Sequence, residues 1–182
     1  MLPLFRAFVD IMLHRRGPED LPASTFLVWA LLAVAIAVTL GIHYVTGGTL
    51  RQATASVVVA FLDVWFVWAI LRVFNREARF RQAMAAMLGT NTILTIIGAP
   101  LVPMVQAAAN AAVAAAAAGS AQPSVSLPLL LTWLLVIWSL LIGAFVFSRA
   151  LERPYLLCLC IVIAYFFLMN ILYFTMAPPR IA

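Results

Sequence analysis

Long apolar stretches constrain the fold of this chain more than any other feature. Five of them, each about twenty residues long, cover residues 25–46, 52–74, 81–105, 127–148 and 155–175. A helical run of this length matches the hydrocarbon thickness of a bilayer. Charged residues make up only 9% of the chain, whereas a soluble domain carries about a quarter. The sequence therefore predicts an all-α, polytopic membrane bundle of five transmembrane helices, forming a single domain over residues 1–182.

The segment before the first apolar stretch, residues 2–15, has the spacing of a short amphipathic helix. Its apolar side consists of Leu2, Phe5, Val9, Met12 and Leu13, and its polar stripe of Arg6, Asp10 and His14. This pattern predicts an interfacial helix that lies on the membrane. A lead-in helix that packs on the bundle is the alternative. Ser24 is the predicted N-cap of the first span.

The third span runs into an alanine-rich segment, residues 106–126, which has no charged residue. Pro100 and Pro103 are expected to kink or end the span before this segment. Alanine is the best helix former, so residues 106–117 either extend the third span or form a short helix of their own. Residues 119–126 are expected to form a loop outside the membrane.

The arginines are distributed unequally between the two sides that five spans define. One side receives Arg6, Arg15, Arg16, Arg72, Arg76, Arg79, Arg81, Arg149 and Arg153, and the other receives Arg51 and Arg180. By the positive-inside rule, the N-terminus is cytoplasmic and the C-terminus lies on the opposite side. The use of arginine alone, together with abundant alanine, suggests a bacterial chain. We therefore expect a multi-pass protein of the bacterial inner membrane with a periplasmic C-terminus.

Residues 52–106 form a hydrophobic hairpin that contains a costly pair of polar residues. Asp63 lies nine residues before Arg72, and Asn91 lies ten residues after Arg81, so their depths nearly match. An Asp at mid-span costs roughly 2.5–3.5 kcal/mol on the insertion scale, which a partner should offset. We expect Asp63 to form a hydrogen bond with Asn91 or with a neighbouring threonine such as Thr95.

The helical face on which Asp63 lies points to the bundle interior. It is shared with Ser56, Val59, Ala60, Val67 and Ile70, whereas Phe61, Trp65, Trp68 and Arg72 occupy the opposite face. Small residues suit the interior, and aromatic residues suit lipid or a partner. Asp63 then either joins two helices or belongs to a proton or ion path. The latter requires a chain of polar groups, for which Asn91, Thr95 and Asn170 are the candidates.

Two further sets of residues suggest contacts with lipid or protein. The turn that contains Arg72, Arg76, Arg79 and Arg81 either sets the topology alone or binds anionic lipid headgroups or an acidic partner. Ala33, Ala37 and Gly41 form a ridge of small residues on the first span, at spacings of four. Such a ridge allows close approach of a second helix, in this chain or in a partner, although alanine-rich spans also produce the spacing by chance.

The sequence contains no recognisable arrangement of catalytic residues. The two histidines lie far apart, and no paired carboxylates, Ser–His–Asp set, phosphate-binding glycine loop or metal motif can be recognised. The positive charge lies at the ends of apolar runs, so it is not the footprint of a nucleic-acid-binding protein. We expect a protein that is not an enzyme, uses no cofactor and associates with membrane lipids, with a membrane-protein partner or with copies of itself.

Three segments give the chain a resemblance to a known family. They are RRGPEDLP, FRQAMAAMLGTNTILTIIGAPL and WSLLIGAFVFSRALERPYLLCLCIVIAYF. In layout and in these segments the chain resembles the bacterial branch of the Yip-type family of five-span membrane proteins. The glycine-to-proline stretch of that family's third span corresponds to Gly89–Pro100, and the acidic DLYGP-type motif of its eukaryotic members is not present. Those members bind small GTPases through a cytosolic N-terminal region, which is too short here to carry that property over.

Three functions are compatible with the sequence. The first is a non-enzymatic membrane protein that acts through association with lipids or membrane proteins. The second is a small transporter or transporter subunit with Asp63 on a proton or ion path. The third is an accessory subunit of a larger membrane complex. A water-connected cavity that reaches Asp63 favours the second, and an Asp63 with a satisfied partner in a dry site favours a structural role.

Overall fold

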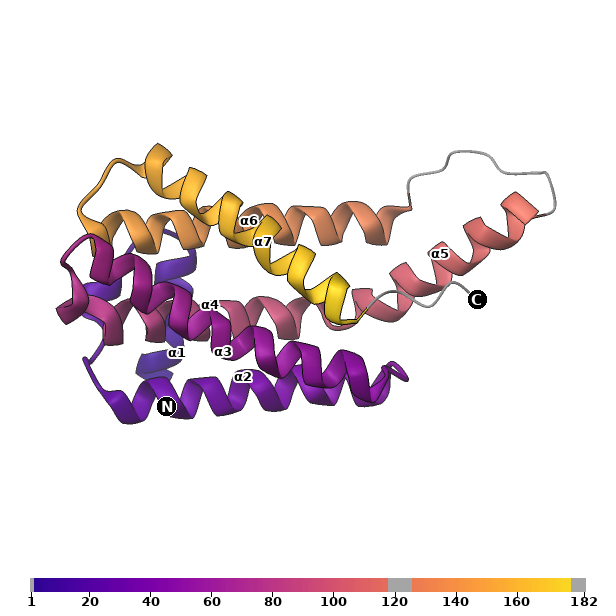
Figure 1. Ribbon diagram of the computed structural model, residues 1–182, viewed down its shortest axis with the longest axis horizontal. Helices are drawn as coiled ribbons and strands as arrows, with labels where there is room; N and C mark the ends of the chain where they lie inside the picture. The colour runs from indigo at the N-terminus through magenta and orange to yellow at the C-terminus, as the bar shows by residue number, and fades with distance from the viewer. Residues whose placement is uncertain (1, 118–125, 178–182) are drawn as a thin grey trace.

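The computed structural model describes residues 2–117 and 126–177, and this part of the chain is helical without strands (Figure 1). The helices are α1 (Leu2–Met12), α2 (Thr25–Val45), α3 (Leu50–Val73), α4 (Phe80–Gly98), α5 (Leu101–Ala117), α6 (Leu127–Leu151) and α7 (Tyr155–Met176). Two short 3-10 turns, η1 (Pro18–Asp20) and η2 (Glu77–Arg79), precede α2 and α4. Part of the predicted loop, residues 119–125, and the Arg180 counted above lie outside the described residues.

Four of these helices, α2, α3, α6 and α7, are long and apolar enough to cross a membrane. A fifth crossing requires α4 and α5 to act as one span, and the two are bent by 53° at the break between them. The bend lies at Pro100, as expected, because proline cannot donate the backbone hydrogen bond that would continue the helix. The helix after the break reaches Ala117, so residues 106–117 are helical.

The helix starts follow from local sequence. Ser24 caps α2 as predicted, because its hydroxyl oxygen accepts a hydrogen bond from Leu27 N at 3.3 Å. Thr49 and Gln52 form a capping box at the start of α3, in which each side chain accepts a hydrogen bond from the other residue's backbone. These caps fix the tight connection between α2 and α3 at one end of the bundle (Figure 1).

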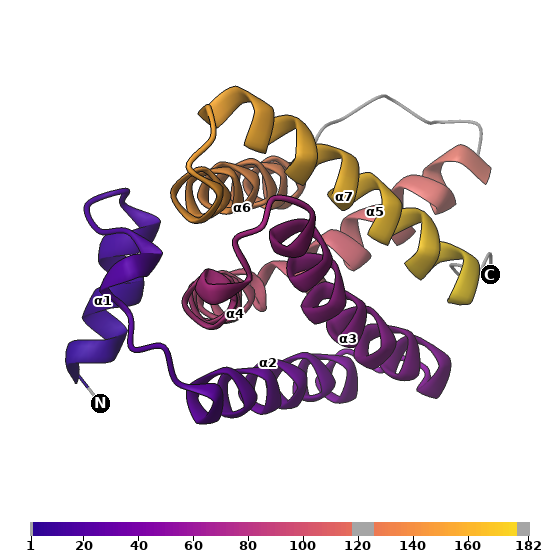
Figure 2. The same ribbon diagram turned by 60° about the vertical axis from the view of Figure 1, so that its left-hand side comes forward.

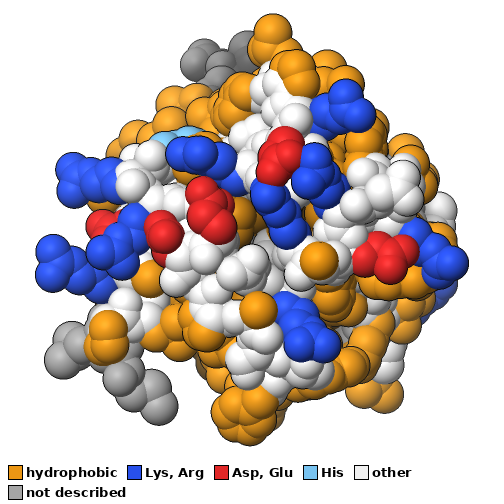
Figure 3. All heavy atoms as spheres, turned by 90° about the vertical axis from the view of Figure 1, so that its left-hand side faces the viewer, with side chains coloured by type: hydrophobic (Ala, Val, Ile, Leu, Met, Phe, Trp, Pro, Cys, Tyr) orange, Lys and Arg blue, Asp and Glu red, His pale blue; other side chains and the backbone are white. Residues whose placement is uncertain are grey.

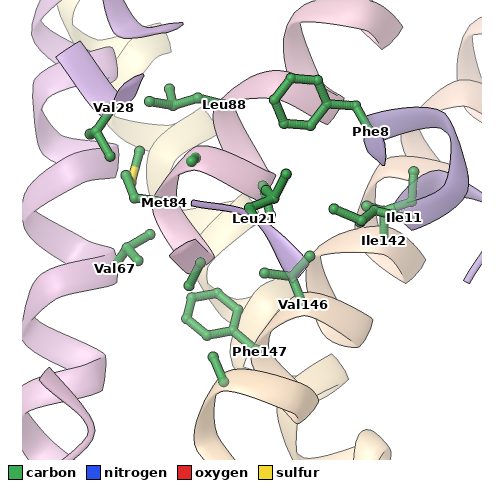
Figure 4. Packing of buried hydrophobic residues seen from close by; sticks show 14 of the residues in the cluster. Phe8, Ile11, Leu21, Val28, Val67, Met84, Leu88, Ile142, Val146 and Phe147 are labelled. Atoms are coloured by element: carbon green, nitrogen blue, oxygen red, sulfur yellow. The ribbon is translucent and has the colours of Figure 1, made fainter. Parts of the chain in front are cut away.

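The centre of the bundle is α4. It packs mainly against α2 and α6, and less against α3, its neighbour along the chain. Ala83, Ala85 and Ala86 are fully buried and allow the neighbouring helices to approach closely. Met84 and Leu88 lie between Val28 of α2 and the residues from α1 and α6 (Figure 4). In lipid, this packing of side chains, rather than their removal from water, holds the helices together.

Helix α1 lies across the long helices rather than along them (Figures 1 and 2). Its buried side consists of Ala7, Phe8, Ile11 and Met12. Phe5 and Leu13, which the sequence places on the apolar side, are 57% and 47% exposed. Helix α1 therefore packs on the bundle through a side that is rotated from the predicted one. Its placement at the membrane surface stays a prediction.

Two contacts fasten the end of α1 to α6. The indole Nε1 of Trp138 donates a hydrogen bond to the backbone oxygen of Met12 at 3.3 Å. The ring of His14 lies against that of Phe145, with 4.5 Å between ring centroids. The His14 side chain thus packs against an aromatic ring of α6.

Candidate functional site

Asp63 lies on the inward face of α3, as its helical position predicts. On the opposite face, Phe61 and Trp65 are 51% and 62% exposed, while Val67 and Leu71 on the inner side are buried. Asp63 lines a space between α3, α4, α6 and α7.

This space is a cavity of about 220 Å³, which we call the Asp63 cavity. Four helices line it. Its walls consist of Val59, Asp63, Met87, Thr90, Asn91, Ser139, Leu140, Gly143, Val162, Tyr165, Phe166, Met169 and Asn170. The polar side chains of three spans therefore meet the carboxyl group of Asp63 in one cavity. A cavity of this size and polarity can hold several water molecules, each of which occupies about 30 Å³ in the liquid.

The expected hydrogen bond of Asp63 is not formed. Within the described residues, its carboxyl group makes no hydrogen bond to Asn91 or to a threonine. The threonine hydroxyls are used inside α4: Thr92 donates to the backbone oxygen of Leu88 at 2.7 Å, and Thr95 to that of Asn91 at 2.8 Å. Threonine commonly bonds to the preceding helical turn in this way. The matching depth of Asp63 and Asn91 leads to a shared cavity and not to a direct bond.

Two other polar groups in the Asp63 cavity can accept a hydrogen bond. The amide nitrogen of Asn170 donates to the backbone oxygen of Phe166 at 2.8 Å, which leaves its side-chain oxygen free to accept. The hydroxyl oxygen of Tyr165 is buried and has no hydrogen-bond partner among the described residues. The Tyr165 ring stacks on that of Phe66, with 3.9 Å between centroids.

A second and larger cavity, of about 530 Å³, adjoins the first, and we call it the polar vestibule. Its polar lining residues are Thr39, His43, Thr46, Gln52, Asn91, Thr95, Gln106, Thr132, Ser139 and Tyr173. They come from α2 to α7 and gather toward the end of the bundle where α2 turns into α3 (Figure 1). Among the described residues that line it, none is Arg, Asp or Glu.

The two cavities share lining residues. Asn91 and Ser139 line both of them, so the two cavities lie side by side at these two side chains. Sequence reasoning missed most of the polar vestibule. A signal was present, since Thr39, His43 and Thr46 on α2 and Asn91 and Thr95 on α4 recur at helical spacings of three or four.

The His43 side chain, which lines the vestibule from α2, forms a hydrogen bond with α3. The Nε2 atom of His43 lies 2.9 Å from the hydroxyl of Ser56 on α3. This contact connects the two helices near their connection. It also places the His43 ring in the wall of the vestibule.

The arginines of the turn between α3 and α4 form most of their ion pairs within the chain. Arg76 and Arg79 both pair with Glu152 in the turn between α6 and α7, and Arg79 also donates to the backbone oxygen of Arg149 at 2.8 Å. Arg72 pairs with Glu77 at 3.5 Å. Arg81 is exposed and forms no ion pair within the described residues. Figure 3 shows arginine and acidic side chains gathered at this end of the bundle. Contact with lipid headgroups or a partner stays a prediction.

The ridge of small residues on α2 is exposed. Ala33, Ala37 and Gly41 face away from α4, against which α2 packs through Val28 and Leu32. A Cβ atom added at Gly41 would meet nothing within 4 Å. The described part of the chain therefore brings no second helix onto this ridge.

Comparison with models of known protein families, with curated proteins and with solved structures found no match. The resemblance to the Yip-type family stays a prediction. Among the described residues, no group of three or more His, Cys, Asp or Glu could hold a metal ion.

Proposed function

We propose that this protein binds a small polar solute within the membrane and acts as a transporter or as the solute-binding subunit of one. The observation that carries the proposal is the position of Asp63 in a cavity that polar side chains of three other spans also line, beside a second and larger cavity. An ionisable residue inside a membrane is costly, and such residues commonly face a water-filled cavity on a substrate or ion path. The sequence alone left this function beside a purely structural role, and the two adjacent cavities favour it.

The lack of a hydrogen bond from the Asp63 carboxyl group to the described residues supports the same function. A residue that joined α3 to α4 would hold its carboxyl group in a hydrogen bond, and Asp63 makes none with the described residues. Its cost is better offset by water or by a bound solute in the cavity.

Thiol labelling of single-cysteine variants tests the proposal. In a background with Cys158→Ala and Cys160→Ala, Thr95→Cys places a thiol in the polar vestibule. Ile97→Cys, on the exposed side of α4, is the matched control that faces lipid. The full chain in lipid nanodiscs should react with a charged, membrane-impermeant thiosulfonate at position 95 at least tenfold faster than at position 97. Equal rates at the two positions would refute a water-connected cavity.

The membrane arrangement is part of the proposal. The bent pair of α4 and α5 acts as one span, which gives five spans in the bacterial inner membrane. The unequal distribution of arginines supports a cytoplasmic N-terminus and a periplasmic C-terminus. The polar vestibule then opens toward the periplasm. The three segments quoted above support placement in the bacterial branch of the Yip-type family.

A second candidate function is association with another membrane protein through α2. The observation that favours it is the exposed ridge of Ala33, Ala37 and Gly41. Replacing Ala37 and Gly41 by leucine should abolish such an assembly, because the larger side chains prevent close approach of a second helix. An unchanged size in mild detergent would rule this candidate out.

A further inference from the structure

The charges that line the two cavities favour a cation. Among the described residues that line the Asp63 cavity and the polar vestibule, Asp63 is the only Asp, Glu or Arg. In a medium of low dielectric constant, a single carboxylate attracts a positive charge strongly, because little solvent screens it. A solute that carries a negative charge would meet no counter-charge there.

The walls around Asp63 favour an organic cation over a metal ion. Val59, Met87, Leu140, Val162 and Met169 give the cavity an apolar surface on several sides. Apolar walls with a few placed polar groups are typical of sites for small organic molecules. The methionine side chains are flexible and polarisable, and they adapt to organic groups of different shape.

The acceptors in the cavity match the donors of a protonated amine. An ammonium group carries N–H donors and has no acceptor. Asp63, the side-chain oxygen of Asn170 and the buried hydroxyl of Tyr165 line one cavity and can each accept a hydrogen bond. A hydrogen bond between an ammonium group and a carboxylate is charge-assisted and roughly twice as strong as a neutral one. Such a ligand would also satisfy the buried Tyr165 hydroxyl.

We propose that the Asp63 cavity binds a small organic ammonium ion through Asp63, Asn170 and Tyr165. The inference rests on the proposed function, since the ligand enters through the polar vestibule. The volume of about 220 Å³ limits its size. Pockets for drug-sized ligands measure about 300–1,000 Å³, so the ligand is a small amine.

Calorimetric titration of the full chain in lipid nanodiscs tests the inference with two probes of similar shape. Benzylammonium chloride should bind, and the neutral benzyl alcohol should bind at least tenfold more weakly. Asp63→Asn should raise the Kd for benzylammonium at least tenfold. Asp20→Asn, which removes the same charge from an exposed position in η1, should leave the Kd unchanged. Val59→Phe, which fills the cavity without a change of charge, should also weaken binding tenfold or more.

Several results would overturn the inference. Equal binding of the alcohol, or an unchanged Kd in both Asp63→Asn and Val59→Phe, would show that the amine binds elsewhere. Binding of sodium ions without binding of benzylammonium would replace the organic ligand by an alkali-metal ion. If position 95 is labelled from water while the amine does not bind, the proposed function stands and the ligand class is wrong. If position 95 is not labelled, the proposed function itself fails.

Discussion

The ring of Phe8 on α1 occupies the space that Gly89 leaves free on α4. A Cβ atom at position 89 would overlap the Phe8 ring, which is only 4% exposed and has little room to move. The missing side chain of one glycine is thus what allows α1 to lie across the bundle. Figure 4 shows Phe8 pointing toward α4 beside Leu88.

Gly89→Ala should therefore destabilise the protein. Overpacking of a well-packed core typically costs about 1–3 kcal/mol, and alanine gains roughly 1 kcal/mol over glycine in a helix. Because the added Cβ atom overlaps a buried ring, we expect the upper part of the first range, so the cost exceeds the gain. The matched control is Gly41→Ala on α2, where a Cβ atom meets nothing within 4 Å and only the helix gain applies. Thermal unfolding in mild detergent should show a lower Tm for the first variant and an equal or higher Tm for the second.

The pair can be tested further by a double-mutant cycle. Phe8→Ala should lower the Tm on its own, because it leaves a cavity beneath α1. In that background, Gly89→Ala should cost little, since the overlapping ring has been removed. Additive effects of the two substitutions would show that the two positions do not interact.

Glu152 connects two turns that lie far apart in the sequence, and its loss should weaken the bundle at low salt. It pairs with both Arg76 and Arg79, and its side chain is 47% exposed. Exposed pairs contribute about 0–1 kcal/mol each, so Glu152→Gln should cost roughly 1 kcal/mol. Glu77→Gln, which removes the one ion pair of Arg72 among the described residues, should cost less. Unfolding at low and at high ionic strength measures this, and a difference that persists at high salt would contradict the electrostatic cause.

Hydropathy and local breakers predicted much of the helical layout. The ends of α2, α3, α6 and α7 lie within three residues of the predicted spans, and the break at Pro100 occurs as expected. The central position of α4 was not predicted. Lipid is as apolar as a protein core, so an apolar stretch does not reveal which of its sides faces protein. The buried run of Ala83, Ala85, Ala86 and Gly89 was the relevant signal.

The candidate site was predicted only in part. The inward face of α3 and the matching depth of Asp63 and Asn91 follow from helical geometry, and both residues do line one cavity. The predicted bond between them was wrong, because the separation of α3 from α4 depends on how all the helices pack. The pairing of Arg79 with Glu152, 73 residues away, is likewise a tertiary contact that no local pattern encodes.

The distribution of arginines predicts the outcome of reporter fusions. Alkaline phosphatase inserted at Gly47, in the connection between α2 and α3, should be active, because that connection is expected in the periplasm. The same enzyme inserted at Asn75, in the arginine turn, should be inactive. Green fluorescent protein at the two positions is the reciprocal control and should fluoresce only at Asn75. Phosphatase activity at Asn75 would contradict the proposed orientation.

Asp63→Leu distinguishes a binding residue from a structural one. An Asp at mid-span costs roughly 2.5–3.5 kcal/mol on the insertion scale, and the carboxyl group has no hydrogen bond to lose among the described residues. Leucine should therefore raise the Tm of the protein in mild detergent, while benzylammonium binding is lost. The gain in the free energy of unfolding should be at most about 3.5 kcal/mol. Asp20→Leu, at an exposed position, should leave both quantities unchanged. A lower Tm in Asp63→Leu would mean that the carboxyl group holds helices together, as in the structural alternative. A higher Tm together with lost binding is the behaviour of a residue that serves function at the expense of stability, because the fold is more stable without it.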